Sequence, residues 1–275
     1  MILHEPELIE EYSDKGYWGD RTLLDRFAAN RAAYPDREAV VDPPNRDELV
    51  GTPPQRLSWA EFGRAVDATA AELARRGFGK DDLLVAQLPN IWELAMLYLA
   101  AAKAGGLLSA LPLQWRSKDV GYVKEITGAR FYASVESFHG FDYRALGQEL
   151  GFEHYIGLAA LTDIAHGNPG RVPEVPVDAN DIFTLCWTSG TESNPKGCPM
   201  SHNNWEYMTN LVFTTCGLRE GDRILCVAPL VNMTAVGVNY LPWLAAGGTL
   251  VLHHPITPEI LLRQLTEEHI EYTIL

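Results

Sequence analysis

The chain has 275 residues, of which 47% are hydrophobic and 21% are charged. A chain of this length is expected to form about two domains, and it can bury a hydrophobic core without stabilising disulfides or metal ions. Because 22 Lys and Arg face 36 Asp and Glu, the net charge is −14 at pH 7. This balance excludes a general nucleic-acid-coating or anionic-membrane surface, so any anionic ligand must be held by locally aimed donors.

Compartment signals point to the cytoplasm. No Cys-x-x-Cys pair occurs among the four cysteines, so we expect buried thiols in a reducing environment. The N-terminal residues carry acid where a secretory signal carries base. The most apolar segment, 92–113, is interrupted by Glu93 and Lys103, whereas a membrane span needs about 20 apolar residues. We therefore expect a cytoplasmic chain with no membrane span and no nucleic-acid partner.

Strand and helix periodicities alternate along the first part of the chain. Ser58-Trp59-Ala60-Glu61 has the spacing of a capping box, and the helix that it opens is expected to end near Gly77. Ser117 is expected to cap a later helix that ends near Gly128. The other expected elements are a strand over 83–88, a helix over 91–103, strands over 107–111 and 130–135, and a helix followed by a strand within 141–158.

The segment 166–181 is rich in glycine and proline and has no period, so it predicts a connector between sub-structures 1–165 and 182–275. The second part alternates again, with strands over 182–187, 223–227, 249–253 and 271–275, helices over 203–215 and 234–244, and a helix opened by Thr257-Pro258. This pattern predicts an α/β fold with layered, parallel-rich sheets and flanking helices. Because the last residues read as a buried strand, we expect the second sub-structure to be truncated within a longer protein.

The most informative segment follows the strand 182–187 and reads Thr188-Ser189-Gly190-Thr191-Glu192-Ser193-Asn194-Pro195-Lys196-Gly197. This segment contains hydroxyl donors, glycines whose backbone amides can approach an anion, and Lys196, the only lysine after residue 125. Expected between a strand and a helix, such a loop suits polyphosphate. An ordinary connecting loop is the alternative on composition alone, and the Gly-Lys-Ser/Thr order of the better-known phosphate loop is absent.

This loop resembles the phosphate-loop signature of the AMP-forming adenylating enzymes, which reads roughly Thr-Ser-Gly-Thr-Thr-Gly-x-Pro-Lys-Gly. That family includes acyl-CoA synthetases, firefly luciferase and the adenylation domains of nonribosomal peptide synthetases. The resemblance covers most of residues 20–275. Its other landmarks, in chain order, are Leu57–Phe62, Pro89-Asn90, Ala102–Gly105, Ser201-His202 and Pro229–Asn232.

The resemblance implies ATP-dependent activation of a carboxylic acid. The acid attacks the α-phosphorus of ATP to give an acyl-adenylate and pyrophosphate, and a thiol, usually coenzyme A, then displaces AMP. The residues implied to hold the β- and γ-phosphates are Thr188, Ser189, Gly190, Thr191 and Lys196, with Thr191 also implied at Mg²⁺. The acyl pocket is expected from Asn232, Met233, Val236 and Gly237, with Trp187 and Tyr240 as further candidates. The acid itself stays open: small aliphatic, alicyclic, aromatic and long-chain acids all fit the resemblance, and fatty acid metabolism is one expected role.

Departures from the family pattern keep other functions open. Glu192 stands where the family more often has Thr, Ser193 where it often has Gly, and Asn232 where it has His or an aromatic residue. The family's ribose-binding aspartate, its aromatic-Gly-x-Thr-Glu segment and its catalytic lysine would lie beyond Leu275. We therefore expect no adenylation by the chain alone, and a homodimer or a separate C-terminal half as possible partners.

Two alternatives remain. One is a non-catalytic remnant or the binding subunit of a split synthetase. The other, an amino-acid adenylation domain, is weakened because no aspartate follows the Pro-Leu segment. Among the histidines, His202 is interpreted as holding the start of a helix, and His253-His254 as a strand end rather than a metal pair, because neighbouring side chains on a strand point to opposite faces.

Overall fold

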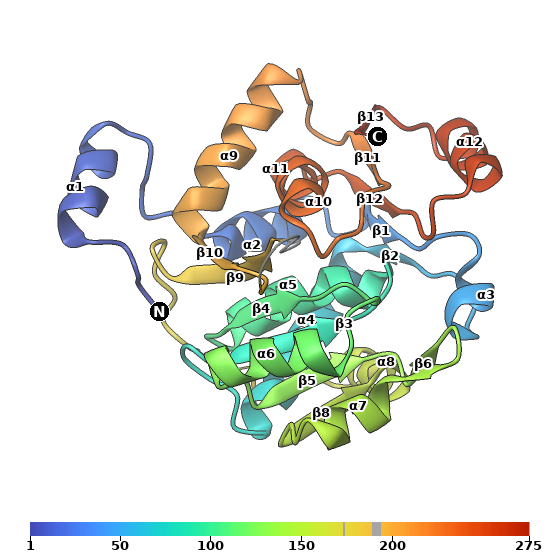
Figure 1. Cartoon of the computed structure of the whole chain (residues 1–275). Coiled ribbons are helices and arrows are strands. Elements are labelled where there is room, and N and C mark those ends of the chain that lie inside the picture. The colour runs from blue at the N-terminus through green and yellow to red at the C-terminus, as the bar shows by residue number, and fades with distance from the viewer. Residues whose placement is uncertain (173, 189–193, 275) are drawn as a thin grey trace.

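The computed structural model describes residues 1–172, 174–188 and 194–274. It contains a six-stranded sheet in the order β10-β9-β4-β3-β5-β8 and a five-stranded sheet in the order β13-β11-β12-β1-β2. Both are largely parallel and are covered by helices (Figure 1). The predicted α/β class with parallel-rich sheets and flanking helices is confirmed.

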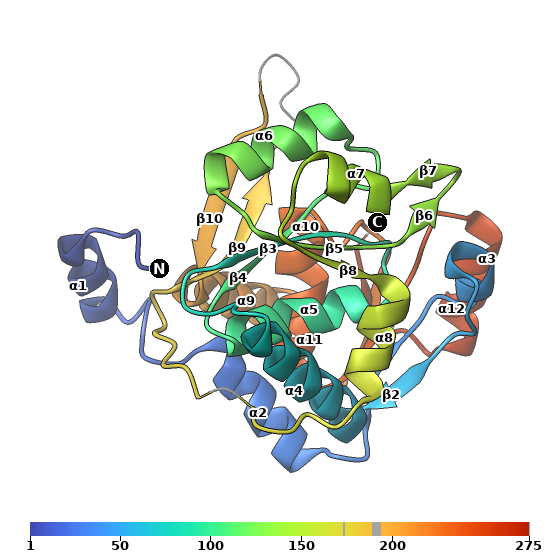
Figure 2. The ribbon, with the colours of Figure 1, turned by 90° about the horizontal axis from the view of Figure 1, so that it is seen from below.

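Most strands of the six-stranded sheet come from the first part of the chain. Its strands are β3 (Leu83–Gln87), β4 (Leu107–Ala110), β5 (Phe131–Ser134), β8 (His154–Gly157), β9 (Ile182–Trp187) and β10 (Gly197–Ser201). Only β10 runs antiparallel, along the edge of the sheet beside β9. The helices α4 (Trp59–Arg75), α5 (Trp92–Lys103) and α8 (Leu158–His166) lie on one face, and α6 (Ser117–Thr127) and α7 (Tyr143–Glu149) on the other (Figure 2). A small hairpin of β6 (Ser137–Phe138) and β7 (Phe141–Asp142) precedes α7.

Helix boundaries test the predicted caps. Ser58 and Glu61 form the expected capping box of α4. Gly128 ends α6 in the left-handed region, with φ 65°, which suits a residue without Cβ. The expected cap at Ser117 is wrong, because Arg116 is the N-cap and Ser117 is already helical. The Arg116 side chain makes no capping hydrogen bond there.

The five-stranded sheet joins β1 (Glu38–Val41) and β2 (Arg56–Ser58) to β11 (Arg223–Cys226), β12 (Thr249–Leu252) and β13 (Tyr272–Thr273). Side chains alternate between its two faces, as strand geometry requires. Ile224 and Leu250 belong to the main core, whereas Leu225 and Val251 pack with residues of α12 (Pro258–Glu267).

Strands from both sides of the segment 166–181 occur in each sheet. Residues 167–172 and 174–180 contain no helix or strand, as expected of a connector. However, β1 and β2 lie with the late strands, and β9 and β10 lie with the early ones. The expected sub-structures 1–165 and 182–275 are therefore interleaved, because periodicity indicates that a strand exists but not which strand it pairs with.

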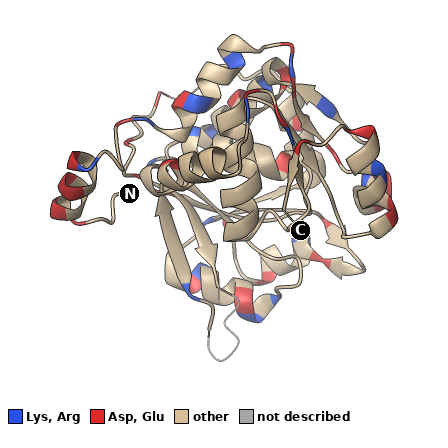
Figure 3. Ribbon diagram, turned by 90° about the horizontal axis from the view of Figure 1, so that it is seen from above, with Lys and Arg blue, Asp and Glu red and all other residues tan. Residues whose placement is uncertain are grey.

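The N-terminal elements were not predicted individually. They are α1 (Pro6–Asp14), α2 (Leu23–Ala33), β1, α3 (Arg46–Val50) and β2. A capping box of Thr22 and Asp25 opens α2. Helix α1 extends away from the sheets, buries no residue and carries mostly acidic charge (Figures 1 and 3).

Helix α5 is buried over residues 92–102, including the acidic Glu93. The Glu93 carboxylate accepts hydrogen bonds from the Arg46 guanidinium at 2.6 and 2.8 Å and from the Thr162 hydroxyl at 2.8 Å. Arg46 also bonds to Asp42 at 2.9 Å. Burial raises the pKa of Asp42 to about 7, against the lowering effect of Arg46. This network holds the start of α5 against the end of β1.

Aromatic packing joins the two layers. Helix α9 (His202–Thr215) packs against α11 (Leu241–Ala246) and β10, and a π-helical turn at Val236–Tyr240 joins α10 (Met233–Ala235) to α11. The Trp59 and Trp243 rings stack at 4.9 Å, and both indole N–H groups donate to the Gly248 carbonyl. The expected helix over 234–244 is thus three consecutive segments.

Candidate functional site

A cleft forms where the carboxyl ends of parallel strands from both sheets meet. It holds a cavity of about 410 Å³. In open α/β sheets, ligands bind at this end of the strands. The lining residues follow or end β3, β4, β9, β11 and β12: Leu88, Pro89, Asn90, Pro112, Leu113, Gln114, Trp115, Trp187, Thr188, Pro229, Val231, Asn232 and His254.

Asn90 ties the two sheets together inside this cleft. Its Nδ2 donates to the Ala228 carbonyl at 2.9 Å and to the His253 carbonyl at 3.1 Å. Its Oδ1 accepts the Leu230 N–H at 2.7 Å. The side chain is only 2% exposed. The sequence marked Asn90 as a strand breaker and family landmark, but its role as a clamp emerges only from the paired sheets.

The base of the predicted phosphate loop lies at the mouth of the same cavity. The Thr188 N–H donates to the Lys196 carbonyl at 3.0 Å, and the Lys196 N–H donates to the Thr188 hydroxyl at 3.2 Å. The Lys196 side chain is exposed. Ser189, Gly190 and Thr191, the other predicted phosphate and Mg²⁺ residues, lie outside the described residues, as do Glu192 and Ser193.

This loop joins β9 to the antiparallel strand β10, and not to a helix as expected. The following helix α9 is capped by its own neighbours, because the Ser201 hydroxyl accepts the Asn204 N–H. Because the strand β10 (Gly197–Ser201) separates the loop from the start of α9 at His202, the dipole of α9 does not act at the loop, and any anion there relies on the loop's own donors and on Lys196.

Aromatic rings form one wall of the cleft. The Trp187 indole N–H donates to the Ser109 hydroxyl at 2.8 Å, which fixes the ring at the end of β9. The Trp115 ring lies 6.4 Å from it in a T-shaped arrangement. Both tryptophans line the cavity, so the cleft offers an edge and a face of aromatic surface to a ligand.

The expected acyl-pocket residues do not all face the cleft. Asn232 lines it, while the Asn232 Oδ1 caps α10 by accepting the Ala235 N–H at 2.8 Å. Met233 and Val236 are not among its lining residues. A Cβ at Gly237 would lie 2.8 Å from the Met208 methyl group, so this residue faces α9.

The candidate Tyr240 is also not among the residues that line the cleft. It is buried, and its hydroxyl donates to the Ala95 carbonyl at 2.7 Å. The segment that the family resemblance implied for the pocket contains a π-helical turn at Val236–Tyr240, which changes the directions of its side chains relative to a regular α-helix.

Three histidines occupy different environments. His253 bonds from Nδ1 to the Gln264 Oε1 at 2.6 Å and accepts the Thr257 N–H, so it holds the loop before α12. His254 lines the cleft, and burial with His253 and His139 nearby lowers the pKa of His254 to about 4. His254 therefore offers a neutral imidazole. The sequence analysis did not predict His254 as a cleft residue. Its position just after the expected strand 249–253 could have indicated it, because ligands bind at the carboxyl ends of such strands.

His202 is the first residue of α9, as interpreted from the sequence. Its Nδ1 accepts the Leu23 N–H at 3.2 Å, and burial lowers the pKa of His202 to about 4. The ring therefore joins α9 to the start of α2 in its neutral form.

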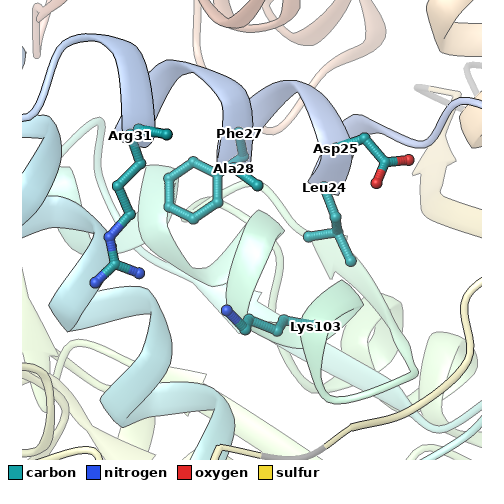
Figure 4. Close-up of a pocket in the computed structure, with 7 residues that line it drawn as sticks. Leu24, Asp25, Phe27, Ala28, Arg31 and Lys103 are labelled. Carbon is teal, nitrogen blue, oxygen red and sulfur yellow. The ribbon is translucent and has the colours of Figure 1, made fainter.

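A second hollow, of about 520 Å³, lies beside α2 and contains none of the predicted site residues (Figure 4). Arg31 and Lys103 border it, and both bind the Asp67 carboxylate at 2.6 Å. Across the part of the chain that the structure describes, no group of three or more His, Cys, Asp and Glu is placed to hold a metal ion. No helix in that part is long and apolar enough to cross a membrane.

Comparison with known proteins connects this site to chemistry. The sequence model of AMP-binding enzymes matches residues 27–275. Triostin synthetase I of Streptomyces triostinicus is 28% identical, over 97% of this chain and 50% of that protein. The 2,3-dihydroxybenzoate-AMP ligase of Bacillus subtilis is 27% identical, over 98% of this chain and 50% of that protein. The chain thus spans about half the length of the curated relatives it matches.

The fold has a close counterpart among solved structures. The apo structure of MbtA from Mycobacterium smegmatis superposes with a TM-score of 0.87 at 23% identity, covering 99% of this chain and 51% of that one. At that identity, the likeness establishes a shared fold.

Proposed function

Because the chain belongs to the AMP-binding enzyme family, we propose that it supplies the pyrophosphate-binding loop and part of the acid pocket of a ligase that activates a carboxylic acid with Mg·ATP. One observation carries this proposal. The base of the phosphate loop, Thr188, and the aromatic wall, Trp187, line the same cavity at the carboxyl ends of the strands.

The chain's own residues have separable tasks in this reaction. Lys196 would neutralise the β- and γ-phosphates, and the hydroxyls and amides of the loop would orient them for departure as pyrophosphate. Mg²⁺, when bound, would share the phosphate charge; it is commonly held through phosphate oxygens with few protein ligands. The described donors fit a polyphosphate, since the Lys196 side chain is exposed and the Thr188 hydroxyl lies at the base of the loop.

We propose an aromatic acid as the substrate class. Trp115 and Trp187 provide an aromatic wall, while Asn232 and the neutral His254 provide polar groups in the same cavity. The Bacillus relative is an AMP ligase of 2,3-dihydroxybenzoate, which supports this class over a fatty acid. Transfer of the acyl group to coenzyme A or another thiol is the second half of the proposal. The ATP requirement supports a cytoplasmic location for this activity.

Calorimetric titration with Mg·ATP tests the loop assignment. We expect binding by the chain and a loss of about 10- to 100-fold in affinity for Lys196→Ala, the range for one charged hydrogen-bonding group. Lys118→Ala, on the exposed face of α6, should bind like the unaltered chain.

Heat that does not depend on Lys196 would refute the assignment. In the whole gene product, ATP–pyrophosphate exchange stimulated by 2,3-dihydroxybenzoate or salicylate tests catalysis and the acid class. Lys196-dependent binding without exchange for any acid would favour a binding subunit over a ligase.

A further inference from the structure

Two cysteines face each other directly across the base of the phosphate loop. In the antiparallel pair β9–β10, Cys186 is opposite Cys198, and the next pair toward the loop is Trp187 with Gly197. Directly opposed residues of antiparallel strands have Cα atoms about 4.5 or 5.5 Å apart and side chains on the same face. Disulfides require Cα separations of about 4.4–6.8 Å, so this pair meets the Cα condition, and only a small closing of the Cβ atoms is needed.

The two thiols differ in accessibility. Cys186 is 4% exposed, with its sulfur 3.6 Å from the Thr184 hydroxyl, whereas Cys198 is half-buried. Burial and the neighbouring Cys198 raise the pKa of Cys186 to about 11, with Thr184 opposing this shift. Cys198 is therefore the thiol that a solvent oxidant meets first, and Cys186 is the buried partner that meets the oxidised sulfur.

The other two cysteines serve as internal references. Cys216 is exposed at the end of α9, where its sulfur accepts a hydrogen bond from the Tyr272 hydroxyl. Cys226 is fully buried in β11 and donates to the Ala228 carbonyl. Neither is opposite another cysteine in the strand registers.

We propose that Cys186 and Cys198 are an oxidisable dithiol that closes to a disulfide across the base of the phosphate loop when the chain meets a peroxide. Hydrogen peroxide oxidises Cys198 to a sulfenic acid, as the S–O bond forms, the O–O bond breaks and one water leaves. The Cys186 thiolate then attacks that sulfur, which forms the S–S bond and releases the hydroxyl as a second water. Two thiols and one peroxide thus give one disulfide and two waters.

Closure has a consequence for the loop that rests on the proposed function. Cys186 precedes Thr188 by two residues and Cys198 follows Lys196 by two. A disulfide brings Cβ atoms to about 3.8 Å, closer than the 4.5–5.5 Å of an open cross-strand pair. Drawing the strands together there displaces Thr188 and Lys196, each two residues from the new bond, and we expect Mg·ATP affinity to fall at least several-fold.

Peroxide titration of the whole chain tests the chemistry first. The reaction is quenched with a maleimide, and intact mass and peptide mapping follow. We expect the loss of two hydrogens, a Cys186–Cys198 cross-linked peptide, and reversal by dithiothreitol. Cys198→Ser should abolish the cross-link, and Cys216→Ser should leave it unchanged.

Sulfinic acid at Cys198 with Cys186 still alkylated would overturn the proposal, and so would full alkylation of both at doses that oxidise Cys216. Because these readouts come from the unaltered chain, they do not depend on how a variant folds. A Mg·ATP titration of the reduced and cross-linked forms then separates the two claims. A cross-link with unchanged affinity refutes the effect on the loop, whereas no binding by either form refutes the proposed function.

Discussion

Replacing Asn90 by Ala should remove the clamp between the two sheets. The side chain serves three backbone groups: the carbonyls of Ala228 and His253 and the N–H of Leu230. The first and last follow β11, the second follows β12, and Asn90 itself follows β3.

The expected cost follows from those three groups. Each buried polar group left without a partner costs about 1–3 kcal/mol. Because Asn90 lines the cleft, water can reach part of the vacated site, so we expect the lower end, about 3 kcal/mol in the free energy of unfolding. Asn90→Asp keeps the shape but turns both donors into acceptors facing two carbonyls, so it should cost more at pH 7 than in acid, where a protonated carboxyl regains one donor.

Urea unfolding followed by tryptophan fluorescence measures this loss. Asn168→Ala is the matched control, since Asn168 is exposed and makes one local bond to the Gly170 N–H; it should change stability by less than about 0.5 kcal/mol. A loss below about 1 kcal/mol for Asn90→Ala, with an unchanged slope against urea, would show that the clamp does not hold the sheets.

Three further changes test other parts of the structure. Since the folded pKa of His202 is about 4, against about 6.5 when unfolded, its contribution to stability is present above pH 6.5. It should decrease by about 3 kcal/mol as pH falls to 4, because the unfolded chain binds more protons in that window. His202→Asn should flatten this part of the stability–pH curve; an unchanged slope would contradict the assignment. Gly248→Ala should destabilise by more than about 3 kcal/mol, because its Cβ would lie 1.9 Å from the Asp222 carbonyl oxygen. Gly19→Ala meets nothing within 4 Å, and equal melting temperatures for the two variants would refute this steric argument. The rate at which the disulfide forms from the Cys198 sulfenic acid should rise about tenfold per pH unit between pH 7.5 and 9.5. The reason is that this step requires the Cys186 thiolate, which is scarce below the raised pKa of about 11. A rate that does not change with pH in stopped-flow measurements would contradict that order of steps.

Elements with strong local signals could be predicted from the sequence. The capping box at Ser58 and the helix α5 depend on contacts within a few residues, and both are present as expected. Strand β10 could not be predicted, because Gly197 and Pro199 argue against a strand. Proline is tolerated there because β10 lies at the edge of the sheet, a fact that only the strand order reveals.

The candidate site shows the same division. Thr188 and Lys196 were identified from a contiguous loop, and the structure brings their backbones together. Asn90 and His254 were missed as site residues, because they meet only where the two sheets do. Gly237 was expected in the pocket from the family resemblance, whereas in the structure it lies in the π-helical turn and faces α9.

The cleft is built from both sheets, so its affinity for an anionic ligand must come from the loop donors and the surrounding walls together. The clamp residue Asn90 precedes the segment 166–181, whereas the phosphate loop and the segment that Asn90 holds follow it. Because β1 pairs with β12 and β4 pairs with β9, neither 1–165 nor 182–275 contains a complete wall of the cavity. In water, the loop donors alone add little binding free energy for an anion, because each hydrogen bond to the anion replaces a hydrogen bond to solvent. These hydrogen bonds become stronger when the second sheet closes the cleft beside them and lowers the local dielectric. A change at Asn90 should therefore weaken ligand binding, even though it removes no donor from the loop.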